Sequence, residues 1–342
     1  DAFLQKESGA KRHMYTRVGN PTTDIAEQKI AALEKTERCR LFGSGMAAIS
    51  AAIMSATAAG KHVVATEASY GPTKEFLREY LPRFGVETTF VDGRNTDAVA
   101  NAVRPNTTAI YMESPGTFLF HVQDIAAICE IAHARGITTI IDNSYASPYF
   151  QQPATLGADL VLHSATKYLA GHSDMVAGAV CGSEARMAKL IEQEGLLLGA
   201  VMDPFASWLM IRSLRTLPIR MERHKENAEK VVSFLESHTK IDAVFYPGSK
   251  SHDGYALAQK QMSGASGLLS FRPVFCDDKS AVKKFCESLR LFQMGVSWGG
   301  HESLVVPLNS EETGNRWLMR LSIGLETAED LAADLDAALT RL

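Results

Sequence analysis

Strand-like segments alternate with helix-like segments through the first two-thirds of this chain. The strand-like segments are short, apolar and rich in β-branched residues, and the helix-like segments between them carry apolar residues at helical spacing. This alternation is typical of a parallel sheet with helices on both faces. We therefore expect an α/β fold, with strands at 62–66, 86–91, 108–112, 138–141, 160–161 and 176–181 and helices at 96–103 and 122–135.

The pattern changes near residue 202, which predicts a second domain. Two consecutive helices are expected at 204–215 and 219–235, and the turn 216–218 between them contains Pro218. A chain of 342 residues also exceeds the size that one hydrophobic core usually serves. We predict an N-terminal arm at 1–22, a large domain at 23–216 and a smaller α+β domain at 217–342. Thr23 is expected to cap the first helix, and Thr327 the last.

Composition argues against several classes of function. The formal net charge is −4, whereas a nucleic-acid-binding protein is expected to carry a basic face. No apolar run approaches the length of a membrane-spanning helix, and no signal peptide is visible. The five cysteines are widely spaced and include no C-x-x-C pair, which favours reduced thiols over disulfides or zinc. We expect a cytoplasmic protein with no metal, nucleic-acid or membrane partner.

One lysine stands at the end of a predicted buried strand, between two hydroxyl residues. Ser164, Thr166 and Lys167 follow the apolar segment 158–162, and a glycine-containing turn follows them. A lysine in such a place must extend to solvent, pair with a carboxylate or be covalently occupied. We interpret Lys167 as the residue that binds pyridoxal phosphate as a Schiff base, with Ser164 and Thr166 near the phosphate.

The neighbouring predicted strand ends in a carboxylate. Asp142 follows the segment 138–141, and Asn143 and Ser144 come next. One interpretation is an Asx turn after the strand. The other is a buried aspartate that keeps a pyridine nitrogen protonated, so that the ring withdraws electrons. Ligands of parallel sheets bind at the carboxyl ends of the strands, where both Asp142 and Lys167 are expected.

Glycines begin the helix that follows residue 42. Gly45 and Met46 would expose backbone N–H groups to an anion such as phosphate, while Ser44 alone would make an ordinary helix cap. Residues 43–48 also match the dinucleotide fingerprint G-x-G-x-x-A, and Glu67 stands where a ribose-binding acid would lie. A nicotinamide-dependent oxidoreductase is therefore an alternative.

The order of the motifs resembles the cysteine/methionine-metabolism family of pyridoxal-phosphate enzymes. The resemblance spans nearly the whole chain and implies fold type I, with a homotetramer built from two catalytic dimers. It rests on five motifs: Tyr-x-Arg with Gly-Asn-Pro-Thr at 15–22, Gly-Ser-Gly-Met-Ala at 43–47, Asp-Asn-Ser at 142–144, Ser-Ala-Thr-Lys-Tyr-Leu-x-Gly-His at 164–172 and Ile-Gly-Leu-Glu at 323–326.

The resemblance also implies a role for each candidate residue. Lys167 binds the cofactor and moves the proton at Cα, with Tyr70 stacking on the cofactor ring and assisting deprotonation of the incoming amine. Arg320 binds the substrate α-carboxylate, assisted by Ser297. The remaining cofactor contacts are Asp142 at the ring nitrogen, Gly45, Met46, Ser164 and Thr166 at the phosphate, and Tyr15 and Arg17 at the phosphate of the neighbouring subunit.

The motifs around the site resemble bacterial cystathionine β-lyases. The segments 113–116, 172–174 and 214–217 support this, as does Trp298, which in β-lyases lines the site. Val296 departs from the pattern, because those β-lyases tend to have tyrosine there. We expect a carbon–sulfur lyase that converts cystathionine to homocysteine, pyruvate and ammonia in methionine biosynthesis. The alternatives are a cystathionine or methionine γ-lyase, a γ-replacement enzyme and an inactive module that only binds the cofactor.

Overall fold

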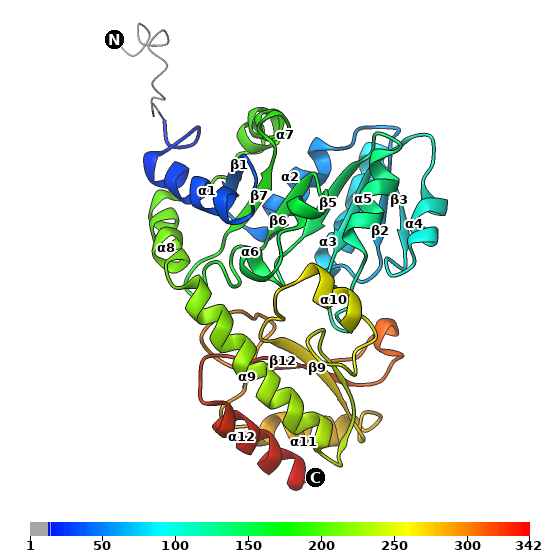
Figure 1. Ribbon diagram of the computed structural model, residues 1–342, viewed down its shortest axis with the longest axis vertical. Coiled ribbons are helices and arrows are strands. Elements are labelled where there is room, and N and C mark those ends of the chain that lie inside the picture. Colours follow the sequence, from blue (N-terminus) through cyan, green and yellow to red (C-terminus); the bar gives the residue numbers. More distant parts are fainter. Residues whose placement is uncertain (1–12, 14) are drawn as a thin grey trace, which may run out of the picture.

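A seven-stranded sheet forms the centre of the larger half of the molecule. The computed structural model describes residues 13 and 15–342. The strand order is β1-β7-β6-β5-β4-β2-β3, and the strands from β6 to β3 run parallel to one another (Figure 1). Strand β7 is antiparallel to both of its neighbours, β1 and β6. The strands are β1 (Arg38–Phe42), β2 (His62–Thr66), β3 (Glu87–Val91), β4 (Thr107–Glu113), β5 (Thr138–Asp142), β6 (Leu160–His163) and β7 (Gly178–Gly182).

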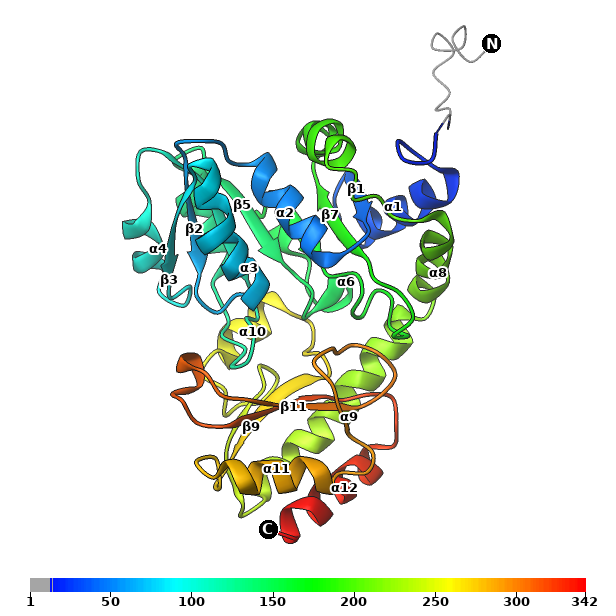
Figure 2. The same ribbon diagram turned by 180° about the vertical axis from the view of Figure 1, so that it is seen from behind.

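Helices cover both faces of this sheet, as the alternating sequence predicts. One apolar cluster packs α2 (Gly45–Ser55) and α7 (Glu184–Leu190) on one face. A second cluster packs α1 (Pro21–Leu33), α5 (Ile125–His133) and α8 (Pro204–Leu214) on the other, as the two opposite views show (Figures 1 and 2). The remaining segments of this half are α3 (Gly71–Glu75), η2 (Phe76–Tyr80), η3 (Leu81–Phe84), α4 (Thr96–Ala102), α6 (Ser147–Phe150), η4 (Pro153–Leu156) and η5 (Ile191–Gly195).

The C-terminal half contains a second, smaller sheet. Its order is β10-β11-β12-β9-β8, mostly antiparallel, and a third apolar cluster lies between this sheet and α9, α11 and α12. Figure 2 shows α11 and α12 below the sheet and α9 running diagonally past it, with the large half above. The elements are α9 (Leu217–Ser237), β8 (Ile241–Phe245), α10 (Tyr255–Gln261), β9 (Leu268–Pro273), α11 (Lys279–Ser288), β10 (Gln293–Met294), β11 (Leu304–Leu308), η6 (Glu311–Thr313), β12 (Leu318–Ser322) and α12 (Ala328–Thr340).

These observations confirm the expected α/β fold with a mostly parallel large sheet and a second sheet. We propose that the domain boundary lies at residue 217, where α9 begins with Pro218 in its first turn. Most of the predicted arm lies outside the described residues.

One of the two predicted helix caps is wrong. Asn20 rather than Thr23 caps α1: its side chain accepts the Thr22 N–H, and Thr23 lies buried within the helix, hydrogen-bonded to Ser207. Thr327 is the N-cap of α12 as predicted, although its side chain makes no capping bond. In α1 the sequence placed a hydroxyl near the helix start, but Asn20 is the residue whose side chain faces a free N–H group.

The described part of the chain contains no helix with the length and hydropathy of a membrane span. All five cysteines are buried and free.

Candidate active site

Lys167 lies where the two sheets face each other. It belongs to the turn that follows β6, and its Nζ donates a hydrogen bond to Ser297 Oγ at 2.9 Å. The same Nζ lies 5.3 Å from the centre of the Trp298 ring. Ser297 and Trp298 belong to the segment between β10 and β11 of the C-terminal sheet. The structure therefore brings together three of the predicted residues from segments 130 positions apart.

The surroundings of Lys167 favour its neutral amine. Burial and, to a smaller extent, the positive charge of Arg320 lower the pKa of Lys167 to about 8, against the opposing charge of Asp142. A lysine with a pKa near neutrality can act both as a nucleophile toward a carbonyl carbon and as a proton acceptor.

Asp142 ends β5 and is 6% exposed. Its Oδ1 accepts the Ser144 backbone N–H at 2.9 Å and the Ser144 hydroxyl at 2.5 Å. That hydroxyl oxygen in turn accepts the Ser164 N–H at 2.6 Å, so Ser144 ties the ends of β5 and β6 together. Burial raises the pKa of Asp142, while the two Ser144 donors and the charges of His163 and Lys167 lower it. The Asx turn weighed from the sequence forms, and the carboxylate still lies close enough to Lys167 to interact with it.

The start of α2 forms a narrow cradle beside Ser164. Ser44 caps the helix by accepting the Ala47 N–H at 3.1 Å, and Gly45 is its first residue. A Cβ on Gly45 would lie 2.7 Å from Ser164 Oγ, so a larger residue would fill the gap between helix and hydroxyl. Both interpretations of this segment are therefore compatible: Ser44 caps the helix, while Gly45 and Met46 start it with N–H groups suited to an anion.

The Thr166 hydroxyl is already used within its own loop. It donates to the Ala177 carbonyl at 3.1 Å and accepts the Ala177 N–H at 3.0 Å. These bonds hold the Lys167 turn against the segment that enters β7.

Tyr70 directly precedes α3 and is 46% exposed. Its N–H donates to Glu113 Oε2 at 2.7 Å, which fixes the turn to the end of β4. Burial, together with the charge of Asp142, raises the pKa of Glu113 well above its ordinary value.

Arg320 comes from β12 and is half-buried. Its Nη2 donates to the Val296 carbonyl at 2.5 Å, next to the residue that bonds Lys167. Burial lowers the pKa of Arg320 to about 10, against a smaller opposing effect of Tyr70. The guanidinium fork is thereby held near Lys167, where it can bind a carboxylate.

Tyr15 and Arg17 lie elsewhere. Arg17 donates to the Leu196 carbonyl at 2.9 Å and lies 5.5 Å from the centre of the Tyr15 ring, which is 61% exposed. The described hydrogen bonds and ring contacts join neither residue to Lys167 or Asp142 of the same chain.

A family model for Cys/Met metabolism PLP-dependent enzymes matches residues 1–340. The chain belongs to this family. L-Methionine γ-lyase from Treponema denticola is 41% identical over all of this chain and 90% of its own length. Cystathionine β-lyase from Lactococcus lactis is 42% identical, and cystathionine γ-lyase from Bacillus subtilis is 40% identical. The alignment with the β-lyase covers 97% of this chain, and the alignment with the γ-lyase covers 96%. Each covers 89% of the relative.

Solved structures agree with this membership. The crystal structure of metB from Corynebacterium glutamicum matches with a TM-score of 0.92 and 39% identity, covering 97% of this chain and 88% of that one. Cystathionine γ-lyase from Lactobacillus plantarum, complexed with L-serine, matches with a TM-score of 0.90 and 36% identity over 97% and 89% of the two chains. The protein is a pyridoxal-phosphate-dependent carbon–sulfur lyase of this family, with fold type I.

The geometry also disfavours the nicotinamide alternative. A dinucleotide fingerprint follows the first strand of a parallel βαβ unit. Here the glycines follow β1, which pairs antiparallel with β7 in the described sheet.

The donor set suits pyridoxal phosphate, whose aldehyde, ring nitrogen and phosphate need an amine, a carboxylate and an anion cradle. Lys167, Asp142 and the start of α2 beside Ser164 offer these three groups. Within the described chain, no group of three His, Cys, Asp or Glu side chains is arranged to hold a metal ion.

Three supporting residues escaped prediction from the sequence. Ser144 stood out only as part of a motif, although its hydroxyl links Asp142 to Ser164. Glu113 was recognisable as a strand end but not as the acceptor for Tyr70. Glu34, which lies buried behind the site, gave no signal, because a glutamate just after an amphipathic helix usually faces solvent.

Proposed function

We propose that the protein is a cystathionine β-lyase, which converts cystathionine to homocysteine, pyruvate and ammonia in methionine biosynthesis. The observation that carries the choice is Trp298, which lies against both Lys167 and Tyr168. Its ring narrows the space next to the reacting amine, in agreement with the tryptophan that the resemblance associates with β-lyases. The relatives support a carbon–sulfur lyase and divide between β and γ specificity.

Lys167 is the proposed catalytic base. When bound, pyridoxal phosphate supplies an electron-withdrawing ring that makes the substrate Cα–H acidic. The Lys167 amine accepts that proton, since its lowered pKa keeps a large neutral fraction near pH 8. Ser297 holds Nζ by accepting its hydrogen bond.

Other residues orient the two ligands. Asp142 would accept a hydrogen bond from a protonated ring nitrogen, and that cation would favour the ionised carboxylate. Gly45, Met46 and Ser164 would hold the phosphate, and Thr166 would join them by turning its hydroxyl proton from the Ala177 carbonyl to the phosphate. Arg320 would bind the substrate α-carboxylate with its guanidinium fork.

Tyr70 would stack on the cofactor ring and, in its phenolate form, accept a proton from the incoming substrate ammonium. Its turn is fixed by Glu113, while its side chain stays exposed.

A homotetramer built from catalytic dimers is part of the proposal. Tyr15 and Arg17 are exposed, and no described hydrogen bond or ring contact joins them to Lys167 or Asp142 of their own chain, which is compatible with contacts to the phosphate site of a neighbouring subunit. Exposed apolar side chains surround the same side of the molecule and suit burial between copies. They are Val18, Ile25, Leu197, Leu198, Phe205 and Trp208.

We place the enzyme in the cytoplasm.

Val296 supports a second candidate, a γ-lyase. Its side chain is 79% exposed beside Ser297, where the β-lyase pattern has tyrosine.

Product analysis with cystathionine tests the choice between the two. Pyruvate with homocysteine is expected. Formation of 2-oxobutyrate with cysteine would overturn the β-lyase proposal in favour of the γ-lyase, and failure to turn over any sulfur amino acid would favour the inactive module.

A further inference from the structure

A fully buried carboxylate lies behind the proposed site and has no role in the proposed mechanism. Glu34 is the C-cap residue of α1 and is 0% exposed. Its Oε1 accepts hydrogen bonds from His163 Nε2 at 2.5 Å and Asn143 Nδ2 at 3.0 Å. Its Oε2 is buried with no hydrogen-bond partner among the described residues. All the polar interactions of this carboxylate in the described chain therefore converge on one oxygen.

The two donors occupy matching positions on neighbouring strands. Asn143 directly follows Asp142, the last residue of β5, and His163 directly precedes Ser164 at the end of β6. Asp142 and Ser164 themselves are joined through the Ser144 hydroxyl. Glu34 thus makes a second link between the same two strand ends, through the residues next to those that are proposed to contact the cofactor.

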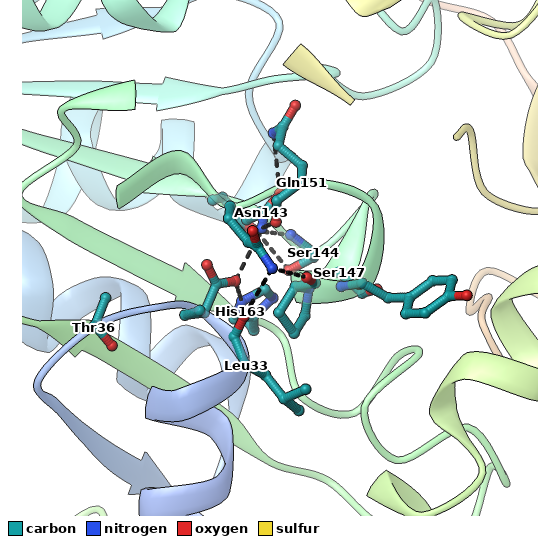
Figure 3. A network of polar contacts seen from close by, with 12 residues as sticks. Leu33, Thr36, Asn143, Ser144, Ser147, Gln151 and His163 are labelled. Carbon is teal, nitrogen blue, oxygen red and sulfur yellow. Dashed lines mark hydrogen bonds and ion pairs between the residues drawn. The ribbon is translucent and has the colours of Figure 1, made fainter. Parts of the chain in front are cut away.

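A buried amide network extends this link. Asn143 Nδ2 also donates to the Gln151 carbonyl at 2.9 Å, and its Oδ1 accepts Gln151 Nε2 at 3.1 Å. Gln151 Nε2 further donates to the Ser114 carbonyl at 2.9 Å, which reaches the end of β4. Figure 3 shows Asn143 at the centre of these contacts, with Gln151 on one side and His163 on the other.

We propose that Glu34 is a positioning residue for the cofactor site, and that it acts by holding His163 and Asn143 at a fixed separation. The inference rests on the proposed roles of Asp142, Ser164 and Lys167. If the Glu34 carboxylate is withdrawn from His163 and Asn143, the ends of β5 and β6 lose one of their two links. The neighbouring residues Asp142 and Ser164 then no longer keep the positions that binding of the cofactor requires. Supporting residues of this kind change the affinity of metal sites by about 10-fold to 100-fold when they are mutated.

Two conservative substitutions separate hydrogen-bond geometry from charge. Glu34→Gln keeps the length of the side chain and an oxygen in the place of Oε1, and its amide nitrogen takes the place of the unpartnered Oε2. Glu34→Asp keeps the charge but withdraws the oxygens by one methylene. If the position of Oε1 is what matters, Glu34→Asp weakens pyridoxal-phosphate binding about 10-fold to 100-fold, while Glu34→Gln changes it by less than about threefold.

The experiment measures the dissociation constant of pyridoxal phosphate by equilibrium dialysis of the full chain, with the visible absorption of the bound cofactor as a second readout. His62→Gln is the matched control. His62 is also a buried histidine held by two side-chain hydrogen bonds, to Thr107 and Thr89, but it begins β2 near the opposite edge of the sheet. His62→Gln is expected to lower the melting temperature without changing cofactor affinity.

The inference is overturned if Glu34→Asp binds the cofactor as the wild type does, if Glu34→Gln binds it as weakly as Glu34→Asp, or if His62→Gln weakens it equally. Should Glu34→Asp fail to fold, His163→Gln and His163→Asn replace it. The glutamine amide is long enough to donate to Glu34 in place of His163 Nε2, whereas the asparagine amide is too short. In that pair His163→Asn is expected to show the loss of affinity, and equal affinities would overturn the inference.

Lys167→Ala separates failure of the inference from failure of the proposed site. If Lys167→Ala keeps the visible band, the site itself is wrong and the inference falls with it. If Lys167→Ala loses the band and Glu34→Asp keeps wild-type affinity, only the inference falls.

Discussion

The two halves of the candidate site are built in different ways. Asp142 and Lys167 come from strand ends of the large sheet, where Ser144 and Glu34 fix the backbone from two sides. Ser297 and Val296 come from a connecting segment of the C-terminal sheet and are exposed. The buried half suits a cofactor that stays bound through many turnovers, and the exposed half suits a substrate that enters and leaves.

The largest effect should come from the buried half. Lys167→Ala is expected to remove the visible band and to lower kcat for cystathionine by at least about 10⁴-fold, because the variant lacks both the covalent partner and the proton acceptor. Absorption spectra and product assays check this. Lys189→Ala, at an exposed lysine, is the control and should match the wild type. A Lys167→Ala variant that keeps half of the wild-type activity would contradict the assignment of cofactor binding and proton transfer to the buried half.

Arg320→Ala tests the half of the site that comes from the C-terminal sheet. Removing the guanidinium should lower kcat/KM by about 10²–10³-fold through the loss of carboxylate binding, while the visible band and the cofactor dissociation constant stay unchanged. Arg320→Lys should recover only part of the loss, since an ammonium cannot form the two-pronged contact. Loss of the cofactor in either variant would show that the two halves are not separable.

The pH dependence of Lys167 sharpens the comparison further. Its pKa is lowered to about 8, so its neutral form is present above that pH and is lost as the pH falls through 8. In cofactor-free protein at pH 8, an amine-directed reagent should modify Lys167 about 100-fold faster than a lysine of ordinary pKa with equal access. Mass spectrometry of tryptic peptides measures the rates. The modification rate of Lys167 is then measured as a function of pH. A midpoint near the ordinary lysine pKa of 10.5 would contradict the role of burial in lowering the pKa of Lys167.

Gly45→Ala should have the smallest effect of the four. Its Cβ would lie 2.7 Å from Ser164 Oγ, so the hydroxyl must shift and cofactor affinity should fall about 10-fold. Gly71→Ala is the matched control, because Gly71 is also the first residue of a helix and a Cβ there meets no atom within 4 Å. Equal cofactor affinities in the two variants would show that Gly45 does not take part in binding the phosphate.

Local pattern predicted the large sheet well, because each of its parallel strands is a short apolar segment flanked by a helix. Strand β1 was missed, since Arg38 and Arg40 interrupt its apolar pattern. Arg40 is nevertheless buried, near Glu27, which only the tertiary structure provides.

In the candidate site, too, some residues could be predicted from local sequence and others depend on the tertiary structure. Motifs located Lys167, Asp142 and Arg320, because the chemistry requires these residue types at strand ends or on a strand. Sequence could not reveal Glu34, since nothing in its local pattern distinguishes a buried hydrogen-bond acceptor from a solvated carboxylate. It placed Glu113 at the end of a strand without showing that Glu113 accepts the Tyr70 N–H.

The first turns of α9 make the large domain dependent on the C-terminal half of the chain. Arg220 is 5% exposed and donates to the Tyr168 carbonyl at 2.8 Å and the Ser213 carbonyl at 3.0 Å. A Cβ on Gly171 would lie 1.8 Å from Arg220 Nη1, so the guanidinium fills the space beneath the loop that carries Lys167. A fragment that stops at residue 216 would lack this guanidinium and its hydrogen bond to the Tyr168 carbonyl, while the Ser213 carbonyl would keep its bonds from the Thr216 N–H and hydroxyl. A recombination event that transferred the cofactor domain alone is therefore expected to leave the loop that carries Lys167 less well supported than one that also transferred the start of α9.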